Sequence, residues 1–158
     1  MGSAITIQIP RAHSRNLSQL PRRRLGDSEF MPFAPAVAPE DVDEVFNLNP
    51  GERYAPRFMT ITCDVHPSWR DRIQAVEHVE GTARPQIIER AINSLYVFIL
   101  AGFKQANGLP GLINTSFNVH EELIINTLDE CAQALADDRI DYVVNEHGVY
   151  GQAFHSGG

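Results

Sequence analysis

The side chains best suited to chemistry in this sequence lie in two short polar stretches. The first runs from Asn114 through Thr115, Ser116 and Phe117 to Asn118, and it follows an apolar Leu-Ile pair. Its amides and hydroxyls are uncharged groups that can hydrogen-bond phosphate or the edge of a nucleobase. A polar turn, in which asparagine side chains cap backbone groups, would use the same residues. The stretch therefore indicates either a ligand-binding segment or a stabilised turn.

The second stretch is His78 to Arg84 (HVEGTAR). Gly81 permits a left-handed turn, and a helix expected soon after it would point backbone amides at an anion. Thr82 could donate a hydroxyl hydrogen bond, and Arg84 could grip phosphate with two parallel guanidinium hydrogen bonds. An ordinary helix cap with a surface arginine is the alternative. The residues alone leave both interpretations open.

Other reactive side chains form no recognisable centre. Ser116 lacks the Gly-x-Ser-x-Gly elbow that surrounds a nucleophilic serine in hydrolases. Glu121 and Glu122 would point to opposite faces of an extended chain, so they are poor candidates for a catalytic pair. The histidines most available for metal binding are scattered without metal-ligand spacing, and we expect no metal site from them: His66, His78, His120 and His147.

Composition restricts the class of protein. The chain has 158 residues and a formal net charge of −7, which argues against a nucleic-acid-binding surface. Lys104 is the only lysine, and five arginines cluster between residues 11 and 24. That cluster, which includes Arg22 and Arg24, is either a solvated basic arm or the edge of an anion site. We expect no membrane span, no export signal, and two reduced thiols in a cytoplasmic protein.

Sequence pattern predicts alternating helices and strands that position these stretches. Two prolines in residues 30–37 indicate an edge or extended segment rather than a central strand, and they could stiffen a wall beside a ligand. Apolar residues of the longest helix should share one face: Ile92, Leu95, Tyr96, Ile99 and Phe103. Thr127 and Glu130 form a capping box. Helices are predicted at 39–46, 85–107 and 127–136, and strands or extended segments at 57–65, 73–79, 111–117, 122–126 and 140–144. The expected fold is a mixed α/β (α+β) single domain.

Four motifs in this order resemble the C-terminal domain of the O-carbamoyltransferases that act on nodulation factors and on antibiotics such as tobramycin. The similarity covers about residues 29–150, and the pairing of the second motif with the third makes it specific. The motifs are FMPFAPAV from Phe30, HVEGTARPQ from His78, LINTSFN from Leu112 and IDYVV from Ile140.

The resemblance implies a YrdC-like twisted mixed sheet, flanked by helices, that binds ATP with Mg²⁺ and carbamoyl phosphate and forms carbamoyl-adenylate. It implies catalytic roles for Arg84 and Ser116. It implies ligand-binding roles for Thr82, Arg84, Asn114, Thr115, Ser116 and Asn118, with Arg22 and Arg24 as further candidates. A separate N-terminal domain, which in the family holds iron or another metal, would pass the carbamoyl group to a hydroxyl acceptor. No metal is expected in this chain.

The sequence pattern and the resemblance together predict the organisation of the chain. Residues 1–28 would be a poorly organised arm, in part a leader from cloning, residues 29–152 the YrdC-like domain, and residues 153–158 a flexible tail. Leu25 and Asp27 occupy the positions of the family's Lys-x-Arg pair, and Met31 a position that is often arginine. The alternative is therefore a non-catalytic module or partner subunit that binds nucleotide or carbamoyl phosphate without turnover.

Overall fold

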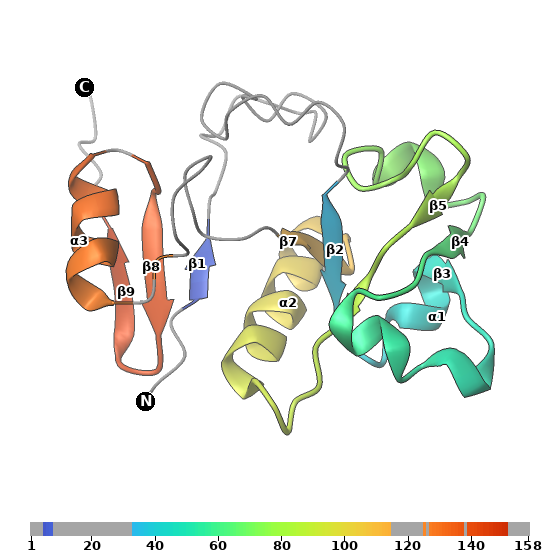
Figure 1. Ribbon diagram of the computed structural model, residues 1–158, viewed down its shortest axis with the longest axis horizontal. Coiled ribbons are helices and arrows are strands. Elements are labelled where there is room, and N and C mark those ends of the chain that lie inside the picture. The colour runs from blue at the N-terminus through green and yellow to red at the C-terminus, as the bar shows by residue number, and fades with distance from the viewer. Residues whose placement is uncertain (1–4, 8–32, 115–124, 126, 138, 152–158) are drawn as a thin grey trace. The chain divides into compact units, whose positions relative to one another are not determined.

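The computed structural model describes residues 5–7, 33–114, 125, 127–137 and 139–151 (Figure 1). The chain divides into two compact units, residues 28–115 (the large unit) and residues 1–27 with 116–158 (the small unit). Both contain helices and strands, which confirms the mixed α/β (α+β) class. None of the described helices is long and apolar enough to cross a membrane. The predicted arm from residue 8, the positions Leu25, Asp27 and Met31, and the tail lie outside the described residues.

Two small sheets form the framework of the large unit. In the first, β2 (Ala34–Val37) lies between β6 (Gln86–Ile87), which is parallel to it, and β7 (Gly111–Asn114), which is antiparallel. In the second, the antiparallel strands are β3 (Phe46–Asn47), β4 (Cys63–Val65) and β5 (Thr82–Ala83). A short extended connection from β5 to β6 therefore joins the two sheets.

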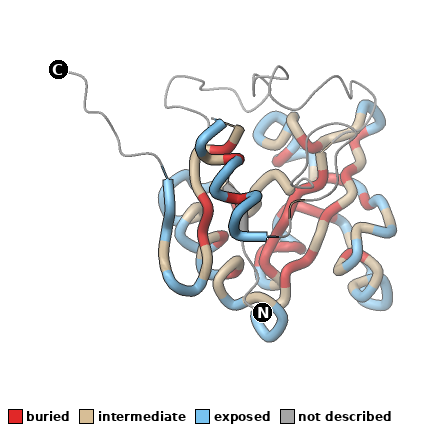
Figure 2. Tube along the Cα trace, turned by 60° about the vertical axis from the view of Figure 1, so that its left-hand side comes forward, coloured by how far each residue is buried: buried red, intermediate tan, exposed pale blue. Residues whose placement is uncertain are grey.

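Apolar side chains, most of them Val, Ile or Leu, build the core of the large unit, drawn in red in Figure 2. Burying each such side chain contributes roughly 1.5–3 kcal/mol. One cluster packs around α1 (Val42–Val45) and includes Val37, Val45, Phe46, Val65, Trp69, Ala83 and Ile87. The other packs α2 (Ser94–Asn107) against β2 and includes Ala36, Ala38, Ile88, Val97 and Leu100. Both clusters hold residues adjacent to β6, so they fix that strand from two sides.

The long helix α2 begins later than the sequence pattern predicts. The Asn93 side chain accepts a hydrogen bond from the Tyr96 backbone amide at 3.0 Å and caps the helix. Gly108, with φ of 68°, ends it as predicted. The predicted apolar face is wrong in part, because Ile92 precedes the helix and is 75% exposed whereas Val97 is fully buried.

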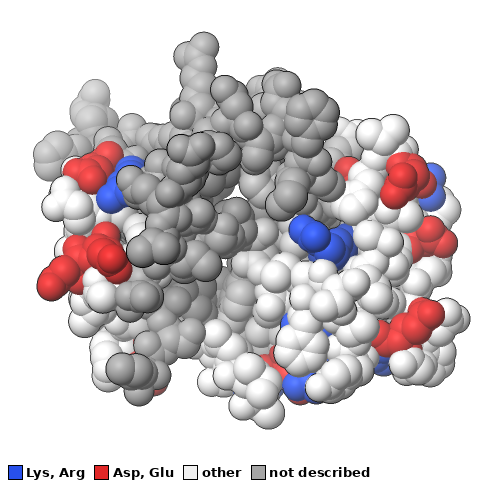
Figure 3. Space-filling view, in the orientation of Figure 1, with Lys and Arg blue, Asp and Glu red and all other residues white. Residues whose placement is uncertain are grey.

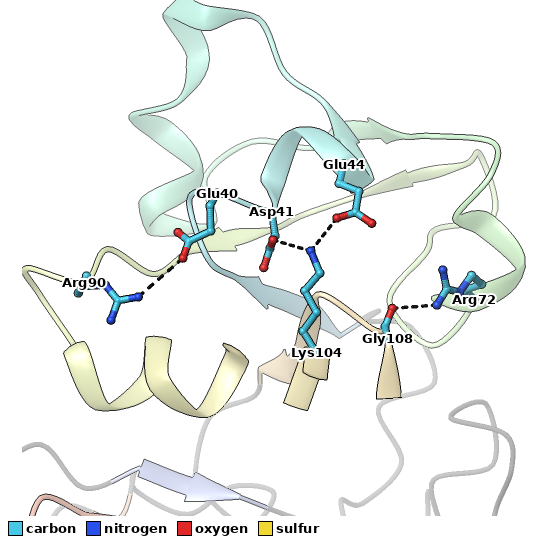
Figure 4. Close-up of polar contacts among 7 residues, drawn as sticks. All are labelled: Glu40, Asp41, Glu44, Arg72, Arg90, Lys104 and Gly108. Atoms are coloured by element: carbon cyan, nitrogen blue, oxygen red, sulfur yellow. Dashed lines mark hydrogen bonds and ion pairs between the residues drawn. The ribbon is translucent and has the colours of Figure 1, made fainter. Parts of the chain in front are cut away.

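Ion pairs hold the carboxyl end of α2 in place (Figure 4). Lys104 Nζ lies 2.7 Å from Asp41 Oδ1 and 2.8 Å from Glu44 Oε2, which ties α2 to α1. These hydrogen bonds raise the pKa of Lys104. Arg72 Nη2 donates to the Gly108 carbonyl at 2.8 Å. Because β7 begins shortly after Gly108, these contacts also fix where β7 starts.

The small unit contains an antiparallel sheet and one helix. Strand β8 (Tyr142–Asn145) lies between β1 (Ile5–Ile7) and β9 (Gly148–Gly151). Helix α3 (Leu128–Ala136) begins with the predicted capping box, in which Thr127 Oγ1 accepts from the Glu130 amide at 3.2 Å. The strand predicted at 140–144 is confirmed with a start two residues later. Ile5–Ile7 of the predicted arm is a strand.

Three expectations for strands are wrong. Residues 55–58 form the 3-10 helix η3 (Ala55–Phe58), so only β4 at the end of the predicted 57–65 strand is extended. Residues 73–79 form turns, with the Val76 amide bonded to the Ile73 carbonyl at 2.9 Å. Pro35 lies in a central strand, which is tolerated because β6 pairs only with the two following residues of β2.

Candidate functional site

The extended segment from Thr82 to Ile87 presents a polar face. Successive side chains of extended backbone point to opposite sides, and burial follows this alternation. The buried positions are Ala83, Pro85 and Ile87. Thr82, Arg84 and Gln86 share the opposite, half-buried side. The sheet framework therefore directs three polar side chains away from the core.

Asn114 joins this segment from the end of β7. Its amide nitrogen Nδ2 donates to Gln86 Oε1 and lies 3.7 Å from Met59 Sδ. The contact exists because β6 and β7 flank β2 on opposite sides, and the half-buried side chains of Gln86 and Asn114 meet across one face of β2. The Gln86–Asn114 hydrogen bond thus brings together one residue from each of the two polar motifs. We call Thr82, Arg84, Gln86 and Asn114 the polar face.

A tight turn orients the start of the polar face. The Gly81 amide donates to the His78 carbonyl at 2.9 Å, and the His78 amide donates to the Thr82 carbonyl at 2.7 Å. Gly81 has φ of 82°, which is the left-handed conformation the sequence predicts. The expectation of a following helix is wrong, since the turn leads into β5 and α2 begins only at Ser94. A helix N-terminus therefore does not supply anion-binding amides here.

The Thr82 hydroxyl is held by neighbours in the same turn. Its Oγ1 lies 3.2 Å from His78 Nδ1 and donates to Glu80 Oε1 at 3.3 Å. The Arg70 guanidinium packs against Gly81 and forms an ion pair with Glu77 at 3.4 Å. The Arg70 guanidinium thus occupies the space that the Cβ of a larger residue at position 81 would need.

Arg84 is the charged member of the polar face. It is half-buried, and within the part of the chain that the structure describes it forms no ion pair. Most other arginines of the large unit pair with carboxylates, as Arg57 does with Glu89 at 3.1 Å and Arg90 with Glu40 at 3.8 Å, and Arg72 bonds the Gly108 carbonyl. In Figure 3 most of the described surface of this unit is uncharged, with Lys, Arg, Asp and Glu groups at separate places and some of opposite charge side by side. Among the described residues, the Arg84 guanidinium therefore has no carboxylate that neutralises it.

The described residues offer no metal centre and no activated thiol. Among them, no group of three His, Cys, Asp or Glu side chains could hold a metal ion. Burial raises the pKa of Cys63 to about 12, with Asp64 and Glu52 adding to the effect. Cys63 therefore stays a neutral thiol near neutral pH and is a poor nucleophile.

Several predicted ligand-binding residues lie outside the described residues: Thr115, Ser116, Asn118, Arg22 and Arg24. The structure adds two residues that the sequence-based site did not include, Gln86 and Met59. Gln86 could have been found, because it lies two positions beyond Arg84 in an extended segment. Met59 could not, because its approach to Asn114 depends on η3 replacing the expected strand.

Comparison with known proteins assigns the chain to a class. The model of the carbamoyltransferase C-terminus matches residues 11–151, and the chain belongs to this family. It is 34% identical over 135 residues to the nodulation protein NolNO of Sinorhizobium fredii. That alignment covers 85% of this chain and 19% of NolNO. It is 35% identical over 115 residues to the nodulation protein NolO of Bradyrhizobium diazoefficiens. That alignment covers 73% of this chain and 21% of NolO. The chain thus spans about a fifth of the length of these relatives.

Proposed function

We propose that this chain is the nucleotide-binding part of an O-carbamoyltransferase, and that it forms carbamoyl-adenylate from ATP and carbamoyl phosphate. Three findings support the proposal. The chain belongs to the carbamoyltransferase C-terminal family, Arg84 has no carboxylate partner among the described residues, and Gln86 bonds Asn114. The last contact carries the most weight, because it joins the two polar motifs into one face.

The proposed reaction has two steps. One water releases phosphate from carbamoyl phosphate and leaves carbamate. A carbamate oxygen then attacks the α-phosphorus of ATP, a new P–O bond forms, and the bond to pyrophosphate breaks. The products are carbamoyl-adenylate, pyrophosphate and phosphate. The polar face would act in the second step, where charge builds up on the α-phosphoryl oxygens.

Arg84 is the residue proposed to stabilise that charge. A guanidinium aimed at the α-phosphoryl group interacts more strongly with the transition state than with the ground state, so it accelerates the step. Asn114, whose amide has a second N–H beyond the one that bonds Gln86, would position the phosphates through an uncharged hydrogen bond, and Thr82 would do so once its hydroxyl turned from Glu80 to a phosphate. Ser116, with a catalytic role, and Thr115 and Asn118 as ligands, belong to the same proposal through the family resemblance.

Mg²⁺ would enter with the nucleotide as the MgATP complex. The ion binds phosphate oxygens and water with few protein ligands, which suits a polar face of one guanidinium, one hydroxyl and two amides. Bound this way, it would neutralise charge on the departing pyrophosphate.

The acceptor and the transfer step are proposed to belong to a further domain. The relatives are about five times as long as the matched region, which leaves room in them for an N-terminal domain that holds a metal. Such a domain or subunit would receive carbamoyl-adenylate and transfer the carbamoyl group to a hydroxyl. A cytoplasmic setting is part of this proposal and agrees with the two free, buried cysteines.

A second candidate is a module that binds nucleotide or carbamoyl phosphate without turnover. It is favoured by Leu25 and Asp27, which stand where the family has a basic pair. Release of pyrophosphate from ATP, Mg²⁺ and carbamoyl phosphate separates the two functions. We expect release by the wild-type chain and a loss of about 2–4 kcal/mol of transition-state stabilisation in Arg84→Ala. The ion-paired control Arg90→Ala should retain the wild-type rate. Nucleotide binding with no release would establish the second candidate instead.

A further inference from the structure

Two aromatic rings lie exposed on the surface of the large unit beside the polar face. Tyr54, directly before η3, is 68% exposed, and Phe58, its last residue, is 56% exposed. Their rings meet edge to face with centroids 5.5 Å apart. Arg57 lies over both rings, at 5.2 Å and 5.9 Å from their centroids. We call Tyr54, Arg57 and Phe58 the aromatic platform.

The backbone beneath the platform is firmly anchored. Pro56 is fully buried, so η3 is fixed to the core between the two exposed rings. Thr60 Oγ1 donates to the Ala55 carbonyl at 2.9 Å, which ties the chain just after η3 back to the first residue of η3. Met59 adopts a left-handed conformation with φ of 54°, which ends η3 sharply. A rigid element that keeps aromatic rings in solvent is prepared for a planar ligand, because little freedom is lost on binding.

The platform is joined to the polar face at two points. Met59 follows Phe58, and its sulfur contacts the Asn114 amide. The Arg57 guanidinium pairs with Glu89, which lies shortly after β6 in the chain. The platform is therefore connected to both strands that supply amides to the polar face.

We infer that Tyr54 and Phe58 form the stacking surface for the purine base of a nucleotide whose phosphates bind the polar face. The inference rests on the proposed function for the phosphate end of the ligand. Aromatic rings stack on any base. Because the two rings are inclined at 60° to each other, the base stacks on the face of one ring and meets the edge of the other. Arg57, which lies over both rings, adds a planar cation. A surface only two rings wide, next to a guanidinium that has no carboxylate partner among the described residues, fits a single nucleobase better than a protein partner, which needs a much larger buried area.

The test compares a ligand that has a base with one that lacks it. Binding of ATP and of inorganic tripolyphosphate to the full chain is measured by calorimetry, and the adenine H2 and H8 shifts are followed by NMR. We expect Tyr54→Ala and Phe58→Ala to weaken ATP binding by roughly 5- to 150-fold each. Tripolyphosphate binding should stay at the wild-type level, and the upfield ring-current shifts of H2 and H8 should shrink.

Matched variants separate stacking from general damage. Tyr54→Phe keeps the ring and should bind ATP as wild type does. Phe98→Ala removes a similarly exposed ring from α2, 72% exposed, and should leave the affinities for ATP and for tripolyphosphate unchanged. Equal loss of ATP and tripolyphosphate in the platform variants, or unchanged ATP binding, would overturn the platform while leaving a phosphate site in place. A wild-type chain that binds neither ligand would overturn the proposed function, and the platform with it.

Discussion

Replacement of Gly81 by alanine tests the turn that orients Thr82 and Arg84. Gly81 has φ of 82°, and a residue with a Cβ costs about 1–2 kcal/mol in that region. The new Cβ would lie 2.6 Å from Arg70 Nη2, so the guanidinium must move away. Its half-exposed ion pair with Glu77 is worth at most about 1 kcal/mol. We therefore expect the free energy of unfolding to fall by about 1–3 kcal/mol.

Urea-induced unfolding, followed by circular dichroism and extrapolated to water, measures this loss. Gly51→Ala is the matched control, because its Cβ meets nothing within 4 Å and its φ is not in the left-handed region. It should stay within about 0.5 kcal/mol of wild type. Arg70→Ala, made in both the wild-type and the Gly81→Ala backgrounds, should cost less in the second, where the guanidinium is already displaced. Wild-type stability of Gly81→Ala would refute the reasoning.

Two further predictions concern the framework of the large unit. Lys104→Met removes the cation that bonds Asp41, which is only 9% exposed. We expect the free energy of unfolding in urea to fall by about 1–3 kcal/mol. Arg90→Met, which removes the cation of a more exposed ion pair, is the control, and an equal loss in the two variants would contradict this. Burial raises the pKa of Cys63 from 9.0 to about 12, so the stability it contributes is complete below pH 9 and is lost as the pH rises toward 12. At pH 10.5 we expect a loss of roughly 2 kcal/mol in wild type that Cys63→Ala does not share. The two proteins share the losses from the other groups whose pKa is raised, namely Tyr96, from 10.0 to about 12, Cys131 and Lys104. Parallel pH profiles of the two proteins would count against this.

Local signals in the sequence predicted the elements that are determined locally. The capping box at Thr127 marks the start of α3, and Gly108 marks the end of α2. The start of α2 was missed because apolar residues before Asn93 continue a helical spacing while belonging to β6 and a turn. The alternation in residues 57–65 also misled, since tertiary packing buries Pro56 and sets Met59 in a left-handed conformation.

The candidate site could be predicted in its residue types and only partly in its assembly. Thr82 and Arg84 were predicted from the turn glycine and from their own hydrogen-bonding groups. Gln86 was missed because the segment after Gly81 was expected to start a helix, whereas it is extended. The bond between Gln86 and Asn114 depends on the strand order around β2. That order places a proline-containing strand at the centre, against the usual preference for an edge, so no short sequence window contains the information.

The most direct test of the central claim is ATP affinity in the presence of Mg²⁺, measured by calorimetry for wild type, Arg84→Gln and Arg90→Gln. The polar face requires that Arg84, which has no carboxylate partner among the described residues, contacts phosphate, whereas Arg90 is occupied by Glu40. A charge-assisted hydrogen bond contributes about 1.5–3 kcal/mol. We predict at least tenfold weaker binding for Arg84→Gln and wild-type binding for Arg90→Gln. Equal affinity of all three proteins for ATP would contradict the account.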